Sequence, residues 1–361
     1  MAIVGWYTIQ HMATEVILLG IAVFWSAVGM GVGVTAIVIP GLKKMQAQKK
    51  KDRKETMYGT EAVEFNKIRK AEERQVKKEP VARIGGLTLL PTILFIGLCV
   101  AWVLQSTLLA VCVMLILGVA LVALYDDLLD IGLLQGTVWR ARKRLLLMGL
   151  VAFVGGVGLY YQLLPGTISL LPFPAFEQIA VGAWLPLLFV AWYIFWQASS
   201  MIDGIDGLSG SIFLVLFIGT GVVSMLQGSV EPLLLSALGA GVMVPWLFVN
   251  SAPAKAYLTE TGITILLMLY ALISFLLGSG EQAGDGLWVG GIFGLALIAT
   301  WGSNALQLLY RKKTGKKLFR IAPLHHHFEA LGLPGHAVVT RYMLATIVCV
   351  IGGLSLLFLL R

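Results

Sequence analysis

Charged residues are scarce in this chain of 361 residues and are absent from long stretches of it. Only 13% of the residues are Asp, Glu, Lys or Arg, whereas 58% are hydrophobic and the mean hydropathy is +0.86. A soluble protein of this length averages about 45–50% apolar residues. The scarcity of charge therefore excludes an ordinary soluble domain and indicates an integral membrane protein.

Cysteine is also rare, and two other patterns are missing. The three cysteines lie inside hydrophobic stretches without metal-ligand spacing, which excludes a disulfide framework and a zinc site. Alternating apolar segments of about ten residues, which a transmembrane β-barrel requires, are not found. No basic segment precedes a short apolar run, so we expect no cleavable signal peptide. The chain is predicted to be an all-α polytopic membrane protein.

Nine uncharged stretches predict the spans. One of them, 84–125, has 42 residues, about twice the roughly 20 that one helix needs to cross a bilayer. We divide it at Gln105-Ser106-Thr107, which gives about ten transmembrane helices in a single domain, 1–361. The nine stretches are 16–42, 84–125, 145–176, 178–202, 207–230, 232–254, 261–280, 286–310 and 342–360.

Lysine and arginine occupy alternate gaps between these spans. Of 27 basic residues, 14 lie in 43–83, four in 126–144 and seven in 311–341. The positive-inside rule places these gaps in the cytoplasm and both termini outside. The net charge of +8 then reflects topology and attraction to anionic lipid. Binding of nucleic acid is not expected, because the basic residues lack interleaved aromatic side chains. The segment 43–83 is expected to be a polar cytoplasmic extension of the first helix.

Carboxylates close one of the predicted spans and join two others on this same face. Asp126-Asp127 ends a span, where adjacent negative charges are unfavourable unless a cation or a proton-transfer role offsets them. Oxygen ligands of this kind suit Mg²⁺ shared with substrate phosphates. The string D-G-I-D-G at 203–207 joins two further spans, and its glycines allow the backbone to approach a ligand closely.

Two further junctions add other functional groups to the same face. Segment 250–262 offers an amide, an aromatic ring, a lysine and the carboxylate of Glu260, which together suit a nucleotide diphosphate. His325, His326 and His327 are consecutive, and neighbouring side chains on a helix diverge by about 100°. They are therefore not expected to share one metal ion, and hydrogen bonding to phosphate or to a carboxylate fits them better.

The string G-K-K-L-F-R-I-A-P-L-H-H-H-F-E-A-L-G at 315–332 resembles the signature of the phospho-N-acetylmuramoyl-pentapeptide transferases. These enzymes form one branch of the polyprenyl-phosphate sugar-1-phosphate transferase family. The aspartate pair, D-G-x-D-G-L and N-x-x-P-A-K are shared across that family. The resemblance covers nearly the whole chain from Lys78 onward, and it implies the ten-helix layout.

The resemblance also implies an activity and a location. The expected enzyme transfers phospho-N-acetylmuramoyl-pentapeptide from UDP-N-acetylmuramoyl-pentapeptide to undecaprenyl phosphate. It releases UMP and forms the first lipid-linked precursor of peptidoglycan, with Mg²⁺ as cofactor. Such an enzyme serves cell-wall biogenesis, and with it cell shape and division. It would lie in the bacterial inner membrane with its active site facing the cytoplasm, and it leaves room for a homodimer.

The roles of individual residues follow from the same resemblance. The catalytic group is expected to contain the aspartate pair, the carboxylate at 260 and the histidines, and Asp127 and Glu260 are expected to hold the metal. The substrate-binding residues are expected to line the nucleotide pocket. The catalytic candidates are Asp126, Asp127, Glu260, His325, His326 and His327, and the substrate-binding candidates are Lys78, Asp203, Gly204, Asp206, Asn250 and Tyr257.

Several positions depart from the family pattern. Gln197 and Ser200 replace two asparagines, and T-E-T-G-I at 259–263 replaces G-D-x-G-S. The extra methylene of Glu260 moves its carboxylate by about 1 Å, a shift that lowers the rate by about 10²-fold unless the site has adapted. These departures motivate a catalytically impaired UDP-sugar-binding homologue as one alternative. Arg83 suggests a polyprenyl-phosphate N-acetylhexosamine-1-phosphate transferase as another. A transporter or channel is the third, although it would require ionisable groups near the middle of the spans.

Overall fold

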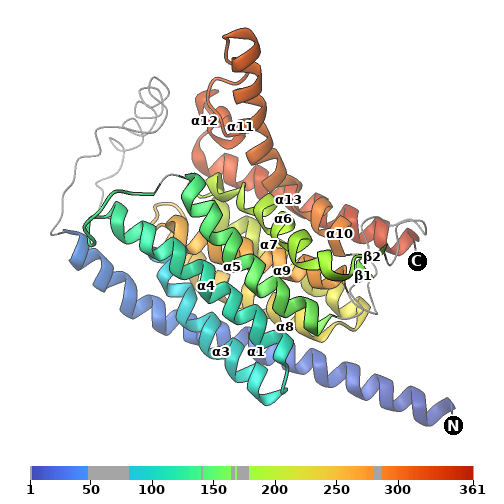
Figure 1. Ribbon diagram of the computed structural model, residues 1–361. Helices are drawn as coiled ribbons and strands as arrows, with labels where there is room; N and C mark the ends of the chain where they lie inside the picture. Colours follow the sequence, from blue (N-terminus) through green and yellow to red (C-terminus); the bar gives the residue numbers. More distant parts are fainter. Residues whose placement is uncertain are drawn as a thin grey trace.

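The structure is a computed structural model that describes residues 2–47, 81–139, 141–163, 167–168, 179–279 and 286–360. Helices dominate it (Figure 1). Within the described residues, nine helices are long and apolar enough to cross a membrane, or ten if the bent pair α10 and α11 forms one span. The prediction of an all-α polytopic membrane protein is confirmed.

The elements follow one another along the sequence. The elements are α1 (Ala2–Ala47), η1 (Gly85–Thr88), α3 (Leu89–Val103), α4 (Thr107–Asp130), α5 (Ala141–Gln162), β1 (Thr167–Ile168), β2 (Ile179–Ala180), η3 (Gly182–Trp184), α6 (Leu185–Gln197), η4 (Ser200–Ile202), α7 (Leu208–Gln227), α8 (Val230–Asn250), α9 (Thr259–Leu277), α10 (Gly286–Phe293), α11 (Leu295–Thr314), α12 (Leu324–Ala330) and α13 (Gly335–Leu360). The two strands pair antiparallel, Thr167 with Ala180 and Ile168 with Ile179.

The predicted division of the stretch 84–125 is confirmed. Helix α3 ends at Val103, and the side chain of Ser106 caps α4 by accepting a hydrogen bond from the backbone N–H of Leu109 at 3.2 Å. A serine at this position satisfies one of the N–H groups that a helix start leaves without a partner. Helix α1 continues past residue 42 to Ala47, as expected for an extension of the first helix, and residues 48–80 of the predicted polar segment lie outside the described residues. Within the stretch 145–176, helix α5 ends at Gln162.

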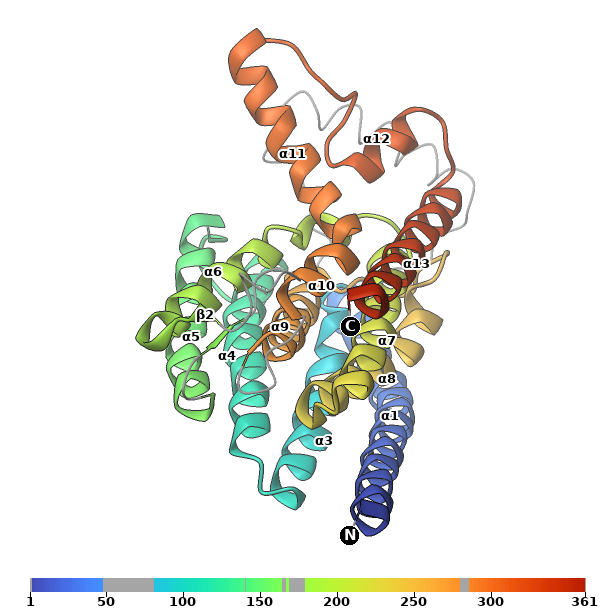
Figure 2. The same ribbon diagram turned by 90° about the vertical axis from the view of Figure 1, so that its right-hand side faces the viewer.

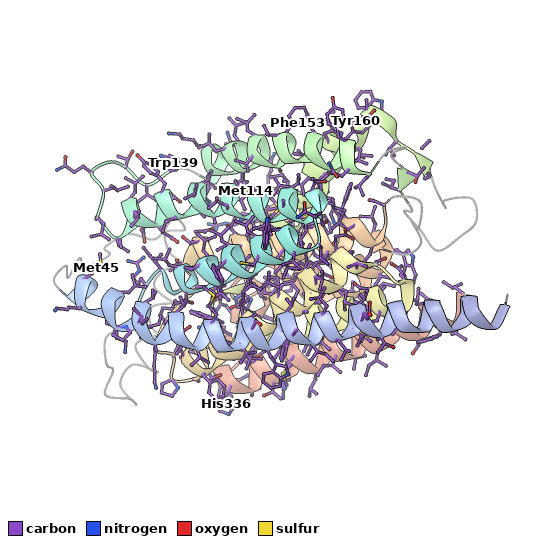
Figure 3. The ribbon with its side chains drawn as sticks, turned by 90° about the horizontal axis from the view of Figure 1, so that it is seen from below. Met45, Met114, Trp139, Phe153, Tyr160 and His336 are labelled. Carbon is purple, nitrogen blue, oxygen red and sulfur yellow. The ribbon has the colours of Figure 1, made fainter. Side chains whose placement is uncertain are left out.

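Helix α9 forms the centre of the bundle. Every residue from Thr261 to Leu277 is buried. A helix that is apolar on all sides belongs inside a bundle rather than on its surface, and α4, α6, α7, α8 and α10 pack around it. Helix α1 runs along one outer flank, as Figure 3 shows. The start of α1 and the end of α13 point toward the end of the molecule that carries β1 and β2 (Figure 1).

The chain before α3 is fastened to the junction before α9. Ala82 and Ala256 form an isolated parallel bridge, and the N–H of Gly85 donates to the carbonyl of Tyr257 at 2.7 Å. A Cβ atom on Gly86 would lie 2.2 Å from Cα of Gly262, so only glycine fits this crossing of two backbones. The start of α9 is therefore fixed by backbone contacts on both sides.

The stretch predicted as one span at 286–310 contains two helices, α10 and α11, which are bent by 69° relative to each other. The bend lies at Gly294, where a Cβ atom would come within 2.3 Å of the indole ring of Trp196. The indole ring therefore occupies the space that a side chain at position 294 would need. Helices α11 and α12 extend away from the other helices (Figure 2). Ser303 of α11 accepts a hydrogen bond from the N–H of Leu324 at 2.9 Å, which fastens α12 to α11.

Candidate active site

Carboxylates from three segments that are distant in sequence meet at one end of the bundle. Asp126 and Asp127 lie in the last turns of α4, Glu260 lies in the first turn of α9, and Asp203 lies between η4 and α7. Figure 3 places Trp139, whose backbone contacts Asp126, at the end of the bundle where α1 finishes near Met45. Tyr160 lies at the opposite end. The predicted convergence of these carboxylates on one face is present in the structure.

Asp127 is buried and accepts hydrogen bonds from the start of α9. Its Oδ2 atom lies 2.6 Å from Oγ1 of Thr259, 2.8 Å from the backbone N of Thr261 and 2.6 Å from Oγ1 of Thr261. The first N–H groups of a helix lack partners inside the helix and favour a negative charge. Asp127 therefore acts as an external cap of α9. These three contacts converge on Oδ2.

Asp126 and Glu260 are joined through Arg144, a residue of α5 that the sequence did not single out. Nη1 of Arg144 lies 2.8 Å from Oδ2 of Asp126, and Nη2 lies 2.9 Å from Oε1 of Glu260. Asp126 also accepts a hydrogen bond from the backbone N–H of Trp139 at 2.9 Å. The guanidinium thus separates two carboxylates that would otherwise repel each other. The available signal was a basic residue shortly after the aspartate pair, but it equally fitted the charge pattern of a cytoplasmic gap.

Thr259 lies between the aspartates and has a strained backbone. Its φ is +57°, a left-handed value that a β-branched residue rarely adopts. Its N–H donates to Oδ2 of Asp203 at 3.1 Å, and its hydroxyl approaches Asp127. Asp203 also accepts a hydrogen bond from Oγ of Ser209 at 2.7 Å. Burial raises the pKa of Asp203 to about 6, although these two donors oppose the shift.

The two loop motifs are tied together by Asp206 and Asn250. Oδ2 of Asp206 accepts a hydrogen bond from the N–H of Ala254 at 2.8 Å. The Asn250 side chain accepts from the N–H of Gly207 at 3.1 Å and donates to the carbonyl of Ala256 at 2.9 Å. Gly207 has a φ of +81°, which glycine adopts without strain. These contacts hold the two junctions together, and the proposed roles of Asp206 and Asn250 toward the nucleotide remain predictions.

The three histidines have different surroundings. His325 is fully buried, and neither ring nitrogen has a hydrogen-bond partner among the described residues. Burial and the adjacent His326 ring hold the pKa of His325 well below its usual value, so the ring is neutral at pH 7. Nδ1 of His326 lies 2.6 Å from Oε2 of Glu329. Nδ1 of His327 accepts a hydrogen bond from the N–H of Arg320 at 3.2 Å.

Gly204 brings the histidines and the carboxylates together. A Cβ atom at this position would lie 2.7 Å from Nε2 of His326 and 2.8 Å from Nε2 of His325. Both rings therefore point their Nε2 atoms at the turn next to Asp203. His327 is not among the three nearest neighbours of this position. Tyr257 is half-buried, and its N–H donates to the carbonyl of Ala82 at 2.9 Å. Lys78 lies outside the described residues.

The donor set suits a metal ion shared with a substrate better than one held by protein ligands alone. Across the described ranges, no three His, Cys, Asp or Glu side chains are placed to hold a metal ion. Oε2 of Glu260 is nevertheless buried, and no described residue donates to it. A buried carboxylate oxygen without a partner is costly and favours a cation. Mg²⁺ commonly binds one or two carboxylates together with substrate phosphates, which fits Asp127 and Glu260.

Comparison with known proteins relates the chain to a family of transferases. Residues 108–278 match the family model described as glycosyl transferase family 4. The phospho-N-acetylmuramoyl-pentapeptide-transferase of Moorella thermoacetica is 30% identical over 281 residues, which cover 77% of this chain and 86% of that protein. The protein of the same name from Clostridium beijerinckii is 30% identical over 243 residues, 66% of this chain and 72% of that protein. The one from Clostridium kluyveri is 28% identical over 244 residues, 66% and 74% of the two chains. The chain therefore belongs, as a divergent member, to the phospho-N-acetylmuramoyl-pentapeptide-transferase family.

Proposed function

We propose that this protein transfers phospho-N-acetylmuramoyl-pentapeptide from UDP-N-acetylmuramoyl-pentapeptide to undecaprenyl phosphate and releases UMP. One observation carries this proposal beyond family membership. Hydrogen bonds and ion pairs connect the carboxylates of α4, α9 and the D-G-I-D-G turn, and two histidines of α12 lie against Gly204 in that turn. Such a set of neighbouring acidic and imidazole groups suits a diphosphate bound with a cation.

The reaction is a displacement at phosphorus. An oxygen of the lipid phosphate forms a bond to the β-phosphorus of the UDP-sugar, the bond from that phosphorus to the bridging oxygen breaks, and UMP leaves with that oxygen. A phosphate monoester has a second pKa of about 6, so the attacking oxygen is mostly deprotonated at neutral pH. Catalysis then depends on orientation and on stabilisation of the developing charge.

The residues of this chain would divide these tasks. Asp127 and Glu260 would hold Mg²⁺, which when bound neutralises charge on the phosphoryl oxygens. Neutral His325 can donate a hydrogen bond to a phosphoryl oxygen without adding a charge. Asp126 is engaged by Arg144 and Trp139, which favours a role in orienting the site over direct proton transfer. Gly204 would let the diphosphate approach the backbone.

The location of the site is part of the proposal. The end of the bundle that carries the carboxylates is also the end where α1 finishes, next to the strongly basic segment 43–83. The positive-inside rule then supports a site that faces the cytoplasm of a bacterial cell and a lipid carrier bound within the inner membrane.

An assay with two donors tests the proposal against its alternatives. Purified protein is incubated with undecaprenyl phosphate, Mg²⁺ and either UDP-N-acetylmuramoyl-pentapeptide or UDP-N-acetylglucosamine, and UMP is measured. We expect UMP and a lipid-linked product with the muramoyl substrate only. Turnover of the N-acetylglucosamine substrate alone would identify the other branch of the family. Binding of either UDP-sugar without UMP release would identify a binding protein. Arg83, which suggested the N-acetylhexosamine alternative, forms an ion pair with Asp130 within the protein.

A further inference from the structure

We propose that Arg144 is the positioning residue that adapts this site to a glutamate at position 260. The inference rests on the proposed function, because it assigns Glu260 to the diphosphate and its cation. It gives the Arg144 guanidinium the task of holding Glu260 in one orientation, with Oε1 on the arginine and Oε2 directed to the ligand.

The geometry of the guanidinium carries the first step. Arg144 uses two different nitrogens for two carboxylates, Asp126 at 2.8 Å and Glu260 at 2.9 Å. The planar group presents its N–H donors in a fixed fork, so that the position of one carboxylate determines the position of the other. Asp126 is itself fixed by the backbone of Trp139 and is buried. The orientation of Glu260 is thus set from the end of α4 through α5.

The length of the Glu260 side chain carries the second step. The backbone at the start of α9 is held by Asp127, which accepts a hydrogen bond from the N–H of Thr261. An aspartate at 260 would therefore withdraw its carboxylate by about 1 Å, and a contact of 2.9 Å would be stretched beyond hydrogen-bonding distance. Glutamate reaches the guanidinium, whereas aspartate in the same backbone does not. Arg144 and Glu260 therefore form a matched pair.

The second carboxylate oxygen of Glu260 is left for the ligand. Oε2 of Glu260 is buried without a donor among the described residues, while Oε1 is engaged. The arginine thereby leaves one oxygen of a fixed carboxylate for the ligand. It also offsets the repulsion that Asp126 and Asp127 exert on Glu260. A lysine at 144 would keep the positive charge but would lack the fork that spans both carboxylates.

Four variants test the pair: Arg144→Lys, Glu260→Asp, the double variant, and Arg142→Lys as control. Arg142 lies on the same helix and is exposed. Its replacement by lysine retains the positive charge at the start of the helix. Binding of Mn²⁺ is followed by electron paramagnetic resonance with UDP-N-acetylmuramoyl-pentapeptide present and the lipid acceptor omitted. UMP release is measured separately with all substrates.

We expect Arg144→Lys and Glu260→Asp each to weaken Mn²⁺ binding by about 10- to 100-fold, and Arg142→Lys to leave it unchanged. The double variant should bind Mn²⁺ only slightly less tightly than the single variant with the lower affinity, because both substitutions break the same contact between Arg144 and Glu260. Two results would overturn the inference. One is a loss of affinity in the double variant equal to the product of the two single losses, and the other is tighter Mn²⁺ binding with faster turnover in Glu260→Asp.

Failure of this inference can be told apart from failure of the proposed function. Thermal unfolding of the four variants in EDTA reports the ion pair without substrate or metal. In one outcome, substitutions at 144 and 260 lower the unfolding temperature non-additively while the wild-type protein releases no UMP from any donor. That result would support the ion pair and reject the transferase function. In the other outcome, wild type releases UMP normally and the two substitutions act independently, which would support the transferase function and reject the positioning role.

Discussion

Thr259 adopts a φ of +57°, and this conformation places its hydroxyl 2.6 Å from Oδ2 of Asp127. A left-handed conformation costs a residue with a Cβ atom about 1–2 kcal/mol, and glycine would avoid that cost. The strain is retained because the same residue donates its N–H to Asp203. Thr259 therefore connects two of the carboxylates of the site, and its conformation is part of the site.

Replacement of this threonine separates strain from function. Thr259→Gly removes the strained Cβ and the hydroxyl together. We expect the variant to unfold at the same or a higher temperature than wild type, but to release UMP about 10-fold more slowly or worse, because Asp127 loses a donor. Thr259→Ser keeps the hydroxyl and is the matched control, with activity close to wild type. Equal activity of the glycine and serine variants would show that the contact with Asp127 is not used.

A methyl group at Gly204 tests the approach of the histidines. The Cβ atom of Gly204→Ala would come within 2.8 Å of both Nε2 atoms of His325 and His326, so the rings must move. We expect UMP release to fall by about 10²-fold, the effect of a displacement of about 1 Å near reacting groups. Gly302→Ala is the control, because nothing lies within 4 Å of its Cβ. Unchanged activity of Gly204→Ala would show that the rings of His325 and His326 do not act in the site.

The pKa of Asp203 predicts a pH dependence of stability. Burial raises this pKa from 3.8 to about 6, so between these values the folded protein binds more protons than the unfolded chain. The stability that Asp203 contributes therefore falls as pH rises through this window and is constant above it. Asparagine at 203 can accept from Thr259 and donate to Ser209 without titrating. We expect the unfolding temperature of Asp203→Asn in metal-free detergent to gain on wild type from about pH 4 to about pH 6. The same difference at all pH values would contradict this prediction.

Labelling tests the orientation of the bundle. Cysteines are introduced at Ser229, between α7 and α8, and at Thr314, at the end of α11, in a background without Cys99, Cys112 and Cys349. An impermeant maleimide added to intact cells should label position 229 but not 314, and inverted vesicles should give the reverse. Labelling of both positions from the same side would contradict the assignment of the site to the cytoplasmic face.

Much of the fold follows from hydrophobic patterning, whereas its details depend on packing. Ser106 marks the division between α3 and α4 because a helix cap has a local signal. The bend at Gly294 has no comparable signal, because a single glycine in an apolar stretch does not by itself predict a break, and the ring of Trp196 that packs against it comes from another helix. Gln197 occupies the position of a family asparagine, but its amide is buried and donates to Thr264 at 3.0 Å. That contact forms only when α6 packs on α9.

The site shows the same division. Its carboxylates and histidines could be predicted because they interrupt apolar stretches, where a polar or charged side chain is unfavourable unless it has a function. Arg144 could not be selected, because Arg142 and Lys143 beside it carry the same charge. Only the packing of α4, α5 and α9 decides which of these residues faces Asp126 and Glu260. The proposed adaptation of the site to Glu260 thus depends on tertiary structure.

The most direct test of the central claim is the rate of UMP release from UDP-N-acetylmuramoyl-pentapeptide and undecaprenyl phosphate by wild type and Asp127→Asn, each with Mg²⁺ and with EDTA. The asparagine keeps the size of the side chain but removes the negative charge that faces the start of α9. We expect turnover by wild type with Mg²⁺ only, and a rate at least about 100-fold lower for Asp127→Asn. Full turnover in EDTA, or wild-type turnover by Asp127→Asn, would contradict a metal-assisted phosphosugar transfer at these carboxylates.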